Sequence, residues 1–217
     1  MICCNSPVTL CYTKSMLDVA RRKQIKVGPK DHGRRMSLDD FDRAIAQEGS
    51  IYELAKGVIE VSDVPKLDHG KQVQELRNQL VVYQVANETV IEYLSGGSDA
   101  KLLIGPSESE RHPDLLIYCS TAPDVPHPWS IWIPEIVVEV VSERSHKRDY
   151  DEKPEEYLEV GVEEYWIVDA AKQQMTVLSR WRGQWKQSVV KPSQKYSTHR
   201  LPGFKLDLKR VFAAAKK

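Results

Sequence analysis

Three stretches between residues 112 and 157 decide the fold: His112-Pro-Asp-Leu-Leu-Ile-Tyr118, Pro134-Glu-Ile-Val-Val-Glu-Val-Val-Ser142 and Asp149-Tyr-Asp-Glu-Lys-Pro-Glu-Glu-Tyr157. In the first, Asp114 opens a short apolar run that predicts a buried strand. In the second, Glu139 lies inside another run, residues 136–141, which is rich in the β-branched residues that favour strands. An ionisable group in a buried strand costs several kcal/mol unless it is paired or holds a metal. The two carboxylates therefore indicate either a pair of buried salt bridges or a metal site.

The segments around these stretches predict an α/β chain. Apolar residues recur every three or four positions between Leu67 and Ala86, as in a long amphipathic helix. The other expected elements are a hairpin of strands 51–54 and 58–61 around Lys56-Gly57, short strands at 90–94 and 101–104, a helix that ends before Gly161, a strand at 165–168, a second hairpin of strands 175–179 and 185–190, and a closing helix at 206–214. Residues 119–133 contain three prolines and are expected to form a loop.

The order of these motifs resembles a known family. Pro113-Asp114, Glu139-Val-Val-Ser142, Asp149-x-x-x-Lys153 and the segment Tyr157–Asp169 follow one another as in the Uma-two family of endonucleases, within the PD-(D/E)XK nuclease superfamily. The resemblance extends from about Met36 to Phe212. It implies a restriction-endonuclease-like core, with a mixed central sheet flanked by helices and with N-terminal and C-terminal β-hairpins. It also implies a metal-dependent endonuclease that hydrolyses DNA phosphodiester bonds.

The resemblance assigns roles to the acidic residues. Asp114 and Glu139 are the expected ligands of Mg²⁺ or Mn²⁺, with the backbone carbonyl of Val140 as a third ligand by analogy with the superfamily. Glu53 matches an early glutamate of the family and would bind the metal directly or through water; the alternative is an exposed strand glutamate. Such a cation polarises phosphoryl oxygens and lowers the pKa of an attacking water. The alternative function is a catalytically silent DNA-binding or regulatory module on the same fold.

The lysine departs from the plain superfamily pattern. There it stands two residues after the glutamate on the same strand, a position that Val141 occupies here. Lys153 matches the family's Asp-x-x-x-Lys helix and is the expected catalytic lysine, with Lys147 as the second candidate. Asp149, Lys153 and Tyr157 are four residues apart and would share one helix face if helical geometry continues across Pro154. The alternative is a surface lysine that pairs with Asp149 and contributes about 0.5 kcal/mol.

Composition limits the partners. The 31 basic and 31 acidic residues give zero formal charge, so DNA would have to be bound by a local basic patch and a metal. No apolar run approaches the roughly 20 residues needed to cross a bilayer. Four cysteines, three of them within the first eleven residues, do not form a disulfide framework and are typical of a reducing cytoplasm. The resemblance implies DNA as the partner, the location is expected to be cytoplasmic, and a homodimer is left open.

The N-terminal region differs from the rest. Residues 1–35 carry scattered basic residues without apolar periodicity, which predicts a disordered basic extension. Either the native protein starts at Met36 and lacks this extension, or the extension contacts DNA. A single nuclease domain is then expected over residues 36–214. At its start, Ser37 and Asp40 have capping-box spacing and predict a short helix to about Ala46.

Three other features leave alternatives open. Trp129 and Trp132, in the proline-rich loop, would pack the loop onto the core or stack on an exposed base, and packing is favoured. Six basic residues of the C-terminal hairpin region would form a solvated face or contact phosphates: Lys172, Arg180, Arg182, Lys186, Lys191 and Lys195. His112 is interpreted as a residue that makes local hydrogen bonds, not as a catalytic group.

Overall fold

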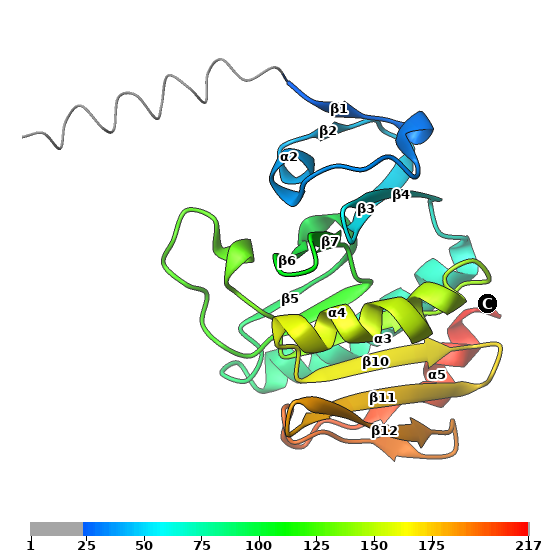
Figure 1. The fold of residues 1–217 in the computed structure, drawn as a ribbon. Helices are drawn as coiled ribbons and strands as arrows, with labels where there is room; N and C mark the ends of the chain where they lie inside the picture. The colour runs from blue at the N-terminus through cyan, green and yellow to red at the C-terminus, as the bar shows by residue number, and fades with distance from the viewer. Residues whose placement is uncertain (1–23, 217) are drawn as a thin grey trace, which may run out of the picture.

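A computed structural model describes residues 24–216, and its centre is a six-stranded sheet (Figure 1). The strands lie in the order β12-β11-β10-β9-β8-β5. β9 and β10 are parallel, and the other neighbouring pairs are antiparallel, so the sheet is mixed. The strands are β5 Tyr93–Ser95, β8 Leu115–Tyr118, β9 Ile136–Val140, β10 Glu164–Asp169, β11 Gln174–Trp181 and β12 Gln184–Val190.

Side-chain alternation along the central strands builds a core on each face of this sheet. All five residues of β9 are buried. Val138 and Val140 belong to one apolar cluster and Val137 to the other. Because successive side chains of a strand point to opposite faces, Glu139 points to the same face as Val137. The carboxylate therefore stands among apolar side chains.

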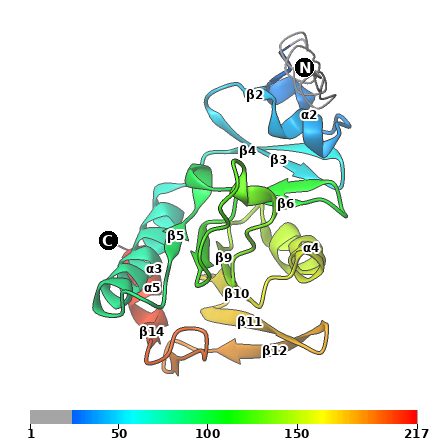
Figure 2. The same cartoon turned by 90° about the vertical axis from the view of Figure 1, so that its left-hand side faces the viewer.

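Helices cover both faces. α3 (Leu67–Ala86) and α5 (Leu208–Ala214) pack together on one face, where Leu76 and Leu80 meet Phe212 (Figure 2). α4 (Lys153–Val160) lies on the opposite face, beside Val137. A single π-helical turn, η4 (Arg148–Glu152), precedes α4, and Gly161 ends it at φ 110°. That left-handed conformation suits a glycine.

A second sheet of four strands lies next to the central one, in the order β4-β3-β7-β6. Its strands are β3 Ser50–Ala55, β4 Val58–Asp63, β6 Leu102–Ile104 and β7 Ser109–Arg111. The β3–β4 hairpin turns at Lys56 and Gly57, both with positive φ. From β7 the chain passes through His112 and Pro113 directly into β8. Asp114 thus lies where the chain leaves one sheet and enters the other.

The N-terminal region corrects one prediction. Residues 24–35, which were expected to belong to a disordered extension, are part of the folded protein. β1 (Lys26–Val27) pairs in parallel with β2 (Ile45–Ala46), and Val27 is 2% exposed within an apolar cluster that contains Phe41 and Tyr52. The apolar side chain of Val27 explains the order, since basic neighbours do not prevent its burial. The part of the expected extension over residues 1–23 lies outside the described residues.

The remaining elements follow the sequence closely. The helix expected after Ser37 is α2 (Leu38–Asp42), with the Ser37 hydroxyl accepting a hydrogen bond from the Asp40 amide at 3.2 Å. α2 is shorter than the expected helix because Ile45 and Ala46 form strand β2. Short segments complete the chain: η1 Pro29–Asp31, η2 Gly97–Asp99, η3 Pro128–Ser130, β13 Lys195–Tyr196 and β14 Leu206–Asp207. Within residues 24–216, no helix combines the length and apolar character that a membrane span requires.

Candidate active site

Strand pairing holds Asp114 against the end of β9. Leu115 pairs with Val138 in antiparallel register, and the Asp114 Oδ2 atom accepts a hydrogen bond from the Val140 amide at 2.7 Å. Gly96 packs against the other side of the Asp114 backbone. A β-carbon at Gly96 would overlap the Asp114 carbonyl oxygen, so only glycine permits this approach. The Asp114 carboxylate is therefore fixed beside the Val140 main chain.

Glu139 is buried, at 5% exposure, and its carboxylate is held by two residues of α4. Its Oε1 atom accepts hydrogen bonds from Lys153 Nζ at 2.7 Å and from the Tyr157 hydroxyl at 2.9 Å. Burial raises the pKa of Glu139 to about 8; Lys153 opposes this shift, and the nearby charges of Asp149 and Asp114 add to it. The site thus contains more negative charge than its own cations neutralise.

Lys153 lies inside the protein, at 4% exposure, between two carboxylates. Besides Glu139 it contacts Asp149 Oδ1 at 3.2 Å. The π-helical turn places Asp149 one turn before Lys153, and such turns occur often at functional sites. Burial would lower the pKa of Lys153, but the charges of Glu139, Glu53 and Asp149 raise it, which keeps the ammonium group charged. The alternative of an exposed Asp149–Lys153 pair is wrong, because both side chains are buried.

Glu53 is also buried, at 6% exposure, and not an exposed strand residue. Its Oε1 atom accepts a hydrogen bond from the His112 amide at 2.9 Å, and its Oε2 atom accepts one from Arg111 at 3.4 Å. Burial alone would raise the pKa of Glu53, but the charges of Lys153 and Arg111 lower it to about 2. Glu53 is therefore an ionised carboxylate with both oxygens engaged.

Arg111 anchors this side of the site and was missed by sequence reasoning. It is fully buried and binds Glu156 in α4 through two hydrogen bonds, at 2.7 and 3.0 Å. The same guanidinium contacts Glu53 and Glu60. Because bidentate arginine–carboxylate pairs fix geometry, Arg111 ties the second sheet to α4.

His69 is a second residue that the sequence did not single out. Its Nε2 atom lies 3.2 Å from Asp114 Oδ2 and 3.0 Å from the Val140 carbonyl oxygen. Burial would lower the pKa of His69, but the hydrogen bond to Asp114 raises it above the usual value. A signal was present: His69 stands three and seven positions before the buried residues Gln72 and Leu76, on the inward face of α3.

Comparisons with known proteins identify a family and a similar fold. The Uma2 family, described as "Putative restriction endonuclease", matches residues 38–209. The chain belongs to the Uma2 family. No curated protein matches it. Among solved structures, the crystal structure of a putative nuclease belonging to DUF820 from Anabaena variabilis has a TM-score of 0.67 at 17% identity, and the match covers 83% of this chain and 99% of that chain. The restriction-endonuclease-like fold expected from the sequence is thus confirmed.

The other lysine candidate of this Uma2 chain lies at the surface of the protein. The Lys147 side chain is 79% exposed and pairs with Glu152 at 3.0 Å. His112 makes local hydrogen-bond contacts, to Glu110 at 3.2 Å and to the Gly97 carbonyl at 3.3 Å. Trp132 packs against Tyr118 with ring centroids 4.1 Å apart, and Trp129 lies 6.0 Å from Trp132. The expected packing of the tryptophan loop is therefore present.

The residues at the centre of this candidate site fit a hard divalent cation. Within residues 24–216, no cluster of three or more His, Cys, Asp and Glu side chains suits a metal, but Mg²⁺ is usually held by only one or two carboxylates, with waters and phosphate completing the shell. Asp114 Oδ1 and Glu139 Oε2 accept no hydrogen bond from any described residue. These free oxygens and the Val140 carbonyl make up a donor set of the right chemistry.

The net charge of the site also fits a bound cation. Six carboxylates of the site face three permanent cations, Arg111, Arg148 and Lys153, which leaves a net charge of −3 when all six carboxylates are ionised and His69 is neutral. The six are Glu53, Glu60, Asp114, Glu139, Asp149 and Glu156. A buried excess of this kind is costly unless a cation offsets it.

Proposed function

We propose that this protein is an endonuclease that hydrolyses DNA phosphodiester bonds with the help of Mg²⁺ or Mn²⁺. The observation that carries the proposal is the arrangement of two carboxylates with free oxygens, the partly buried Asp114 and the buried Glu139, beside the charged Lys153. A bound cation would polarise the phosphoryl group and lower the pKa of an attacking water. Asp114, Glu139 and the Val140 carbonyl would hold it. Because both Glu53 oxygens are engaged, contact through water suits Glu53 better than direct coordination.

The chain's own residues would position the reacting groups. Lys153 brings a fixed positive charge to the site, where it can orient water and offset charge that develops on the phosphoryl oxygens. Tyr157 holds the Glu139 carboxylate in one orientation through its hydroxyl. His69 contacts both Asp114 and the Val140 carbonyl, and so keeps two proposed ligands in register.

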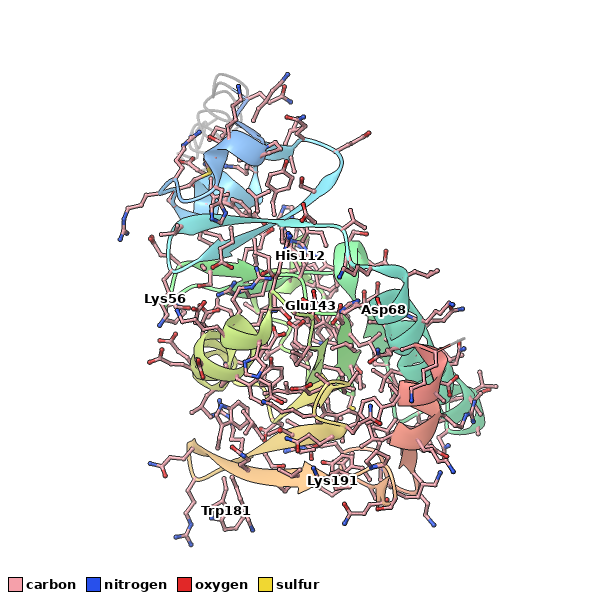
Figure 3. All side chains as sticks on the ribbon, turned by 90° about the vertical axis from the view of Figure 1, so that its right-hand side faces the viewer. Lys56, Asp68, His112, Glu143, Trp181 and Lys191 are labelled. Carbon is pink, nitrogen blue, oxygen red and sulfur yellow. The ribbon has the colours of Figure 1, made fainter. Side chains whose placement is uncertain are left out.

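Basic side chains near the site offer contacts for the DNA backbone. Lys66 pairs with Glu143 at 3.3 Å, Arg144 with Asp63 at 2.5 Å, and Arg148 with Glu60 at 3.4 Å. Figure 3 shows Glu143 and Asp68 in the region between the second sheet and the central sheet. The pairs of Lys66 and Arg144 are exposed, and exposed ion pairs contribute little, about 0–1 kcal/mol each. DNA phosphates could therefore replace Glu143 and Asp63 at small cost, which would supply the local basic patch that a chain of zero net charge needs.

A nicking assay on supercoiled plasmid tests the proposal. The wild type is incubated with Mg²⁺, with Mn²⁺ or with a chelator, beside Asp114→Asn and Glu139→Gln. A matched control is Glu163→Gln, which removes a carboxylate that pairs with Arg200 outside the site. We expect cleavage only with metal, in the wild type and the control. If Asp114→Asn and Glu139→Gln both cut as fast as the wild type, the assignment of these two residues is wrong. If the wild type binds DNA but does not cleave it with either metal, the silent binding module is favoured.

Saturating Mn²⁺ gives a second measurement that does not depend on turnover. A ligand that binds only the native state raises the melting temperature. We expect this rise in the wild type and in Glu163→Gln, and its loss in Asp114→Asn. An equal rise in all three proteins would place the metal elsewhere.

A further inference from the structure

Asp149 is a buried acid to which the proposed hydrolysis gives no role. It belongs to the π-helical turn η4 and is 1% exposed. Neither of its carboxylate oxygens accepts a hydrogen bond from a described residue, whereas buried polar atoms normally have such partners. An ionised carboxylate is also costly to bury. Its position inside the site therefore asks for a physical reason.

The backbone of Asp149 is held from two sides. Its amide donates a hydrogen bond to the Ser145 carbonyl at 2.9 Å, and its carbonyl accepts one from the Tyr165 hydroxyl, also at 2.9 Å. Tyr165 belongs to β10 and is fully buried, so this second bond joins the π-helical turn to the central sheet. The main chain thus fixes where the Asp149 carboxylate lies, without the help of side-chain hydrogen bonds.

The charged neighbour of this carboxylate is Lys153. Lys153 Nζ lies 3.2 Å from Asp149 Oδ1, which is close enough for an ion pair, but its hydrogen bond goes to Glu139 Oε1 at 2.7 Å. An ammonium group has three N–H donors. Lys153 therefore has donors left over beside a carboxylate that has acceptors left over. Asp149 is the second and weaker partner of this lysine.

A cation bound by Glu139 would change which partner is the stronger one. The negative charge of Glu139 would then be shared with the cation, and the cation and the ammonium group would repel each other as like charges. Asp149 is not among the proposed ligands, so it would keep its charge for Lys153. Both oxygens of Glu53 are engaged with other residues, which leaves Asp149 as the better acceptor.

We propose that Asp149 is a positioning residue for Lys153, which it retains as a charged group in the site while Glu139 binds a divalent cation. The inference rests on the proposed function for the cation and for the role of Lys153. Without the Asp149 charge, the ammonium group and the cation would compete for Glu139. Asp149→Asn, which keeps the size of the side chain, should therefore weaken metal binding and release Lys153 once metal is bound.

A double-mutant cycle tests whether Asp149 acts through the lysine. Mg²⁺ binding is measured by calorimetry for the wild type, Asp149→Asn, Lys153→Met and the double variant, at a temperature at which all are folded. We expect Asp149→Asn to weaken binding at least tenfold in the wild type but no more than threefold beside Lys153→Met, where no ammonium group is left to retain. A residue that acts only by its own charge, or only on the fold, gives the same factor in both backgrounds, and that result would overturn the proposal.

Glu156→Gln is the matched control for the loss of one buried negative charge. Glu156 is also 1% exposed and belongs to the same site, but it pairs with Arg111 at 2.7 Å instead of Lys153. We expect this variant to weaken Mg²⁺ binding no more than threefold. A loss as large as that of Asp149→Asn would show that any buried carboxylate of the site has this effect, and the proposal would be wrong.

NMR of the Lys153 ammonium group gives a measurement that does not depend on the Lys153→Met protein. A buried, hydrogen-bonded ammonium group exchanges slowly with water, so its proton–nitrogen signal can be observed and assigned through the lysine side-chain carbons. With saturating Mg²⁺, the signal should persist in the wild type and be lost by exchange in Asp149→Asn. A signal that persists in both proteins, or is lost in both, would contradict the proposal.

The outcomes also separate this inference from the endonuclease activity. If Mg²⁺ binds with the expected coupling but no plasmid is nicked, the role of Asp149 stands and the proposed function fails. If plasmid is nicked but Asp149→Asn has the same effect with and without Lys153, the proposed function stands and the role of Asp149 fails. If calorimetry detects no Mg²⁺ binding to the wild type, both are wrong.

Discussion

Lys153 Nζ lies 2.7 Å from Glu139 Oε1, and both side chains are buried. The lysine comes from α4 and the glutamate from β9, so a helix and the strand on which it packs each supply one partner of this contact. In the superfamily pattern the lysine stands two residues after the glutamate. Here the ammonium group reaches the carboxylate from helix α4, and Val141 occupies the position that the lysine has in the superfamily pattern.

Replacing this lysine tests its role. We expect Lys153→Ala to lower plasmid nicking by two orders of magnitude or more, about 2.7 kcal/mol of transition-state stabilisation, because a fixed positive charge is lost. Lys147→Ala is the matched control and should cut normally, since Lys147 is exposed and pairs only with Glu152 among the described residues. If Lys147→Ala loses activity while Lys153→Ala keeps it, the roles are reversed; full activity in both means that no lysine completes the site.

The same variant should also be less stable. From the sequence alone, little change in melting is expected. The buried position changes this, because Lys153→Ala leaves Glu139 and Asp149 without their cation, and breaking a buried pair costs about 3–5 kcal/mol. The nicking assay is therefore done at a temperature at which calorimetry shows the variant to be folded. A melting temperature equal to that of the wild type would contradict the buried pair.

How far the sequence predicted this site depends on how local each signal is. The strand that follows Asp114, the strand that carries Glu139 and the helix from Leu67 to Ala86 were predicted because apolar runs and periodicity depend on neighbouring residues. β7 was missed. Its sequence, Ser109-Glu-Arg111, is polar, yet all three residues are buried. The carboxylates that offset the burial of Arg111, Glu156 and Glu53, are distant in sequence. His69 was missed for a similar reason, since its contacts with Asp114 and Val140 exist only after α3 packs on the sheet.

The raised pKa of Glu139 predicts how stability changes with pH. Because its pKa of about 8 in the folded protein exceeds the ordinary value of 4.5, the native state holds a proton that the unfolded chain loses between these values. Stability in chelator should therefore fall as pH rises from about 5 to 8, by at most about 1.4 kcal/mol per pH unit. His69, whose pKa is also raised, acts in the same direction.

The variant Glu139→Gln isolates the part of the pH dependence of stability that the Glu139 carboxyl group contributes. Thermal melts of the two proteins in chelator, at half-unit steps from pH 5.5 to 8.5, should show a steeper decline in the wild type. Saturating Mn²⁺ should reduce the decline in the wild type, because a cation favours the ionised carboxylate. Parallel pH profiles for wild type and variant would mean that Glu139 is ionised throughout this range.

The close contact between Gly96 and Asp114 predicts that a larger residue at position 96 displaces the Asp114 carboxylate. Gly96→Ala places a β-carbon against the Asp114 carbonyl group, so the backbone that carries this carboxylate must shift. We expect nicking and the stabilisation by Mn²⁺ to be strongly reduced. Gly97→Ala is the matched control. It has positive φ but nothing within 4 Å of the added carbon, so it should cost only about 1 kcal/mol of strain and retain metal binding. Similar metal responses in the two variants would show that the Gly96 contact does not position Asp114.

Truncation tests the part of the N-terminal region that is folded. We compare a variant that lacks residues 1–23 with one that begins at Met36. The second loses β1 and uncovers the apolar cluster of Phe41 and Tyr52, in which Val27 is buried. Exposing one or two such side chains costs about 2 kcal/mol or more, so the variant that begins at Met36 should unfold at a lower urea concentration than the variant that lacks residues 1–23. Val27→Ala in the full chain should shift the midpoint in the same direction but by less, because it removes only two methyl groups from the cluster. Equal midpoints for the two truncated proteins would show that residues 24–35 add nothing to the stability of the fold, and the domain would then begin at Met36 as the sequence pattern predicts.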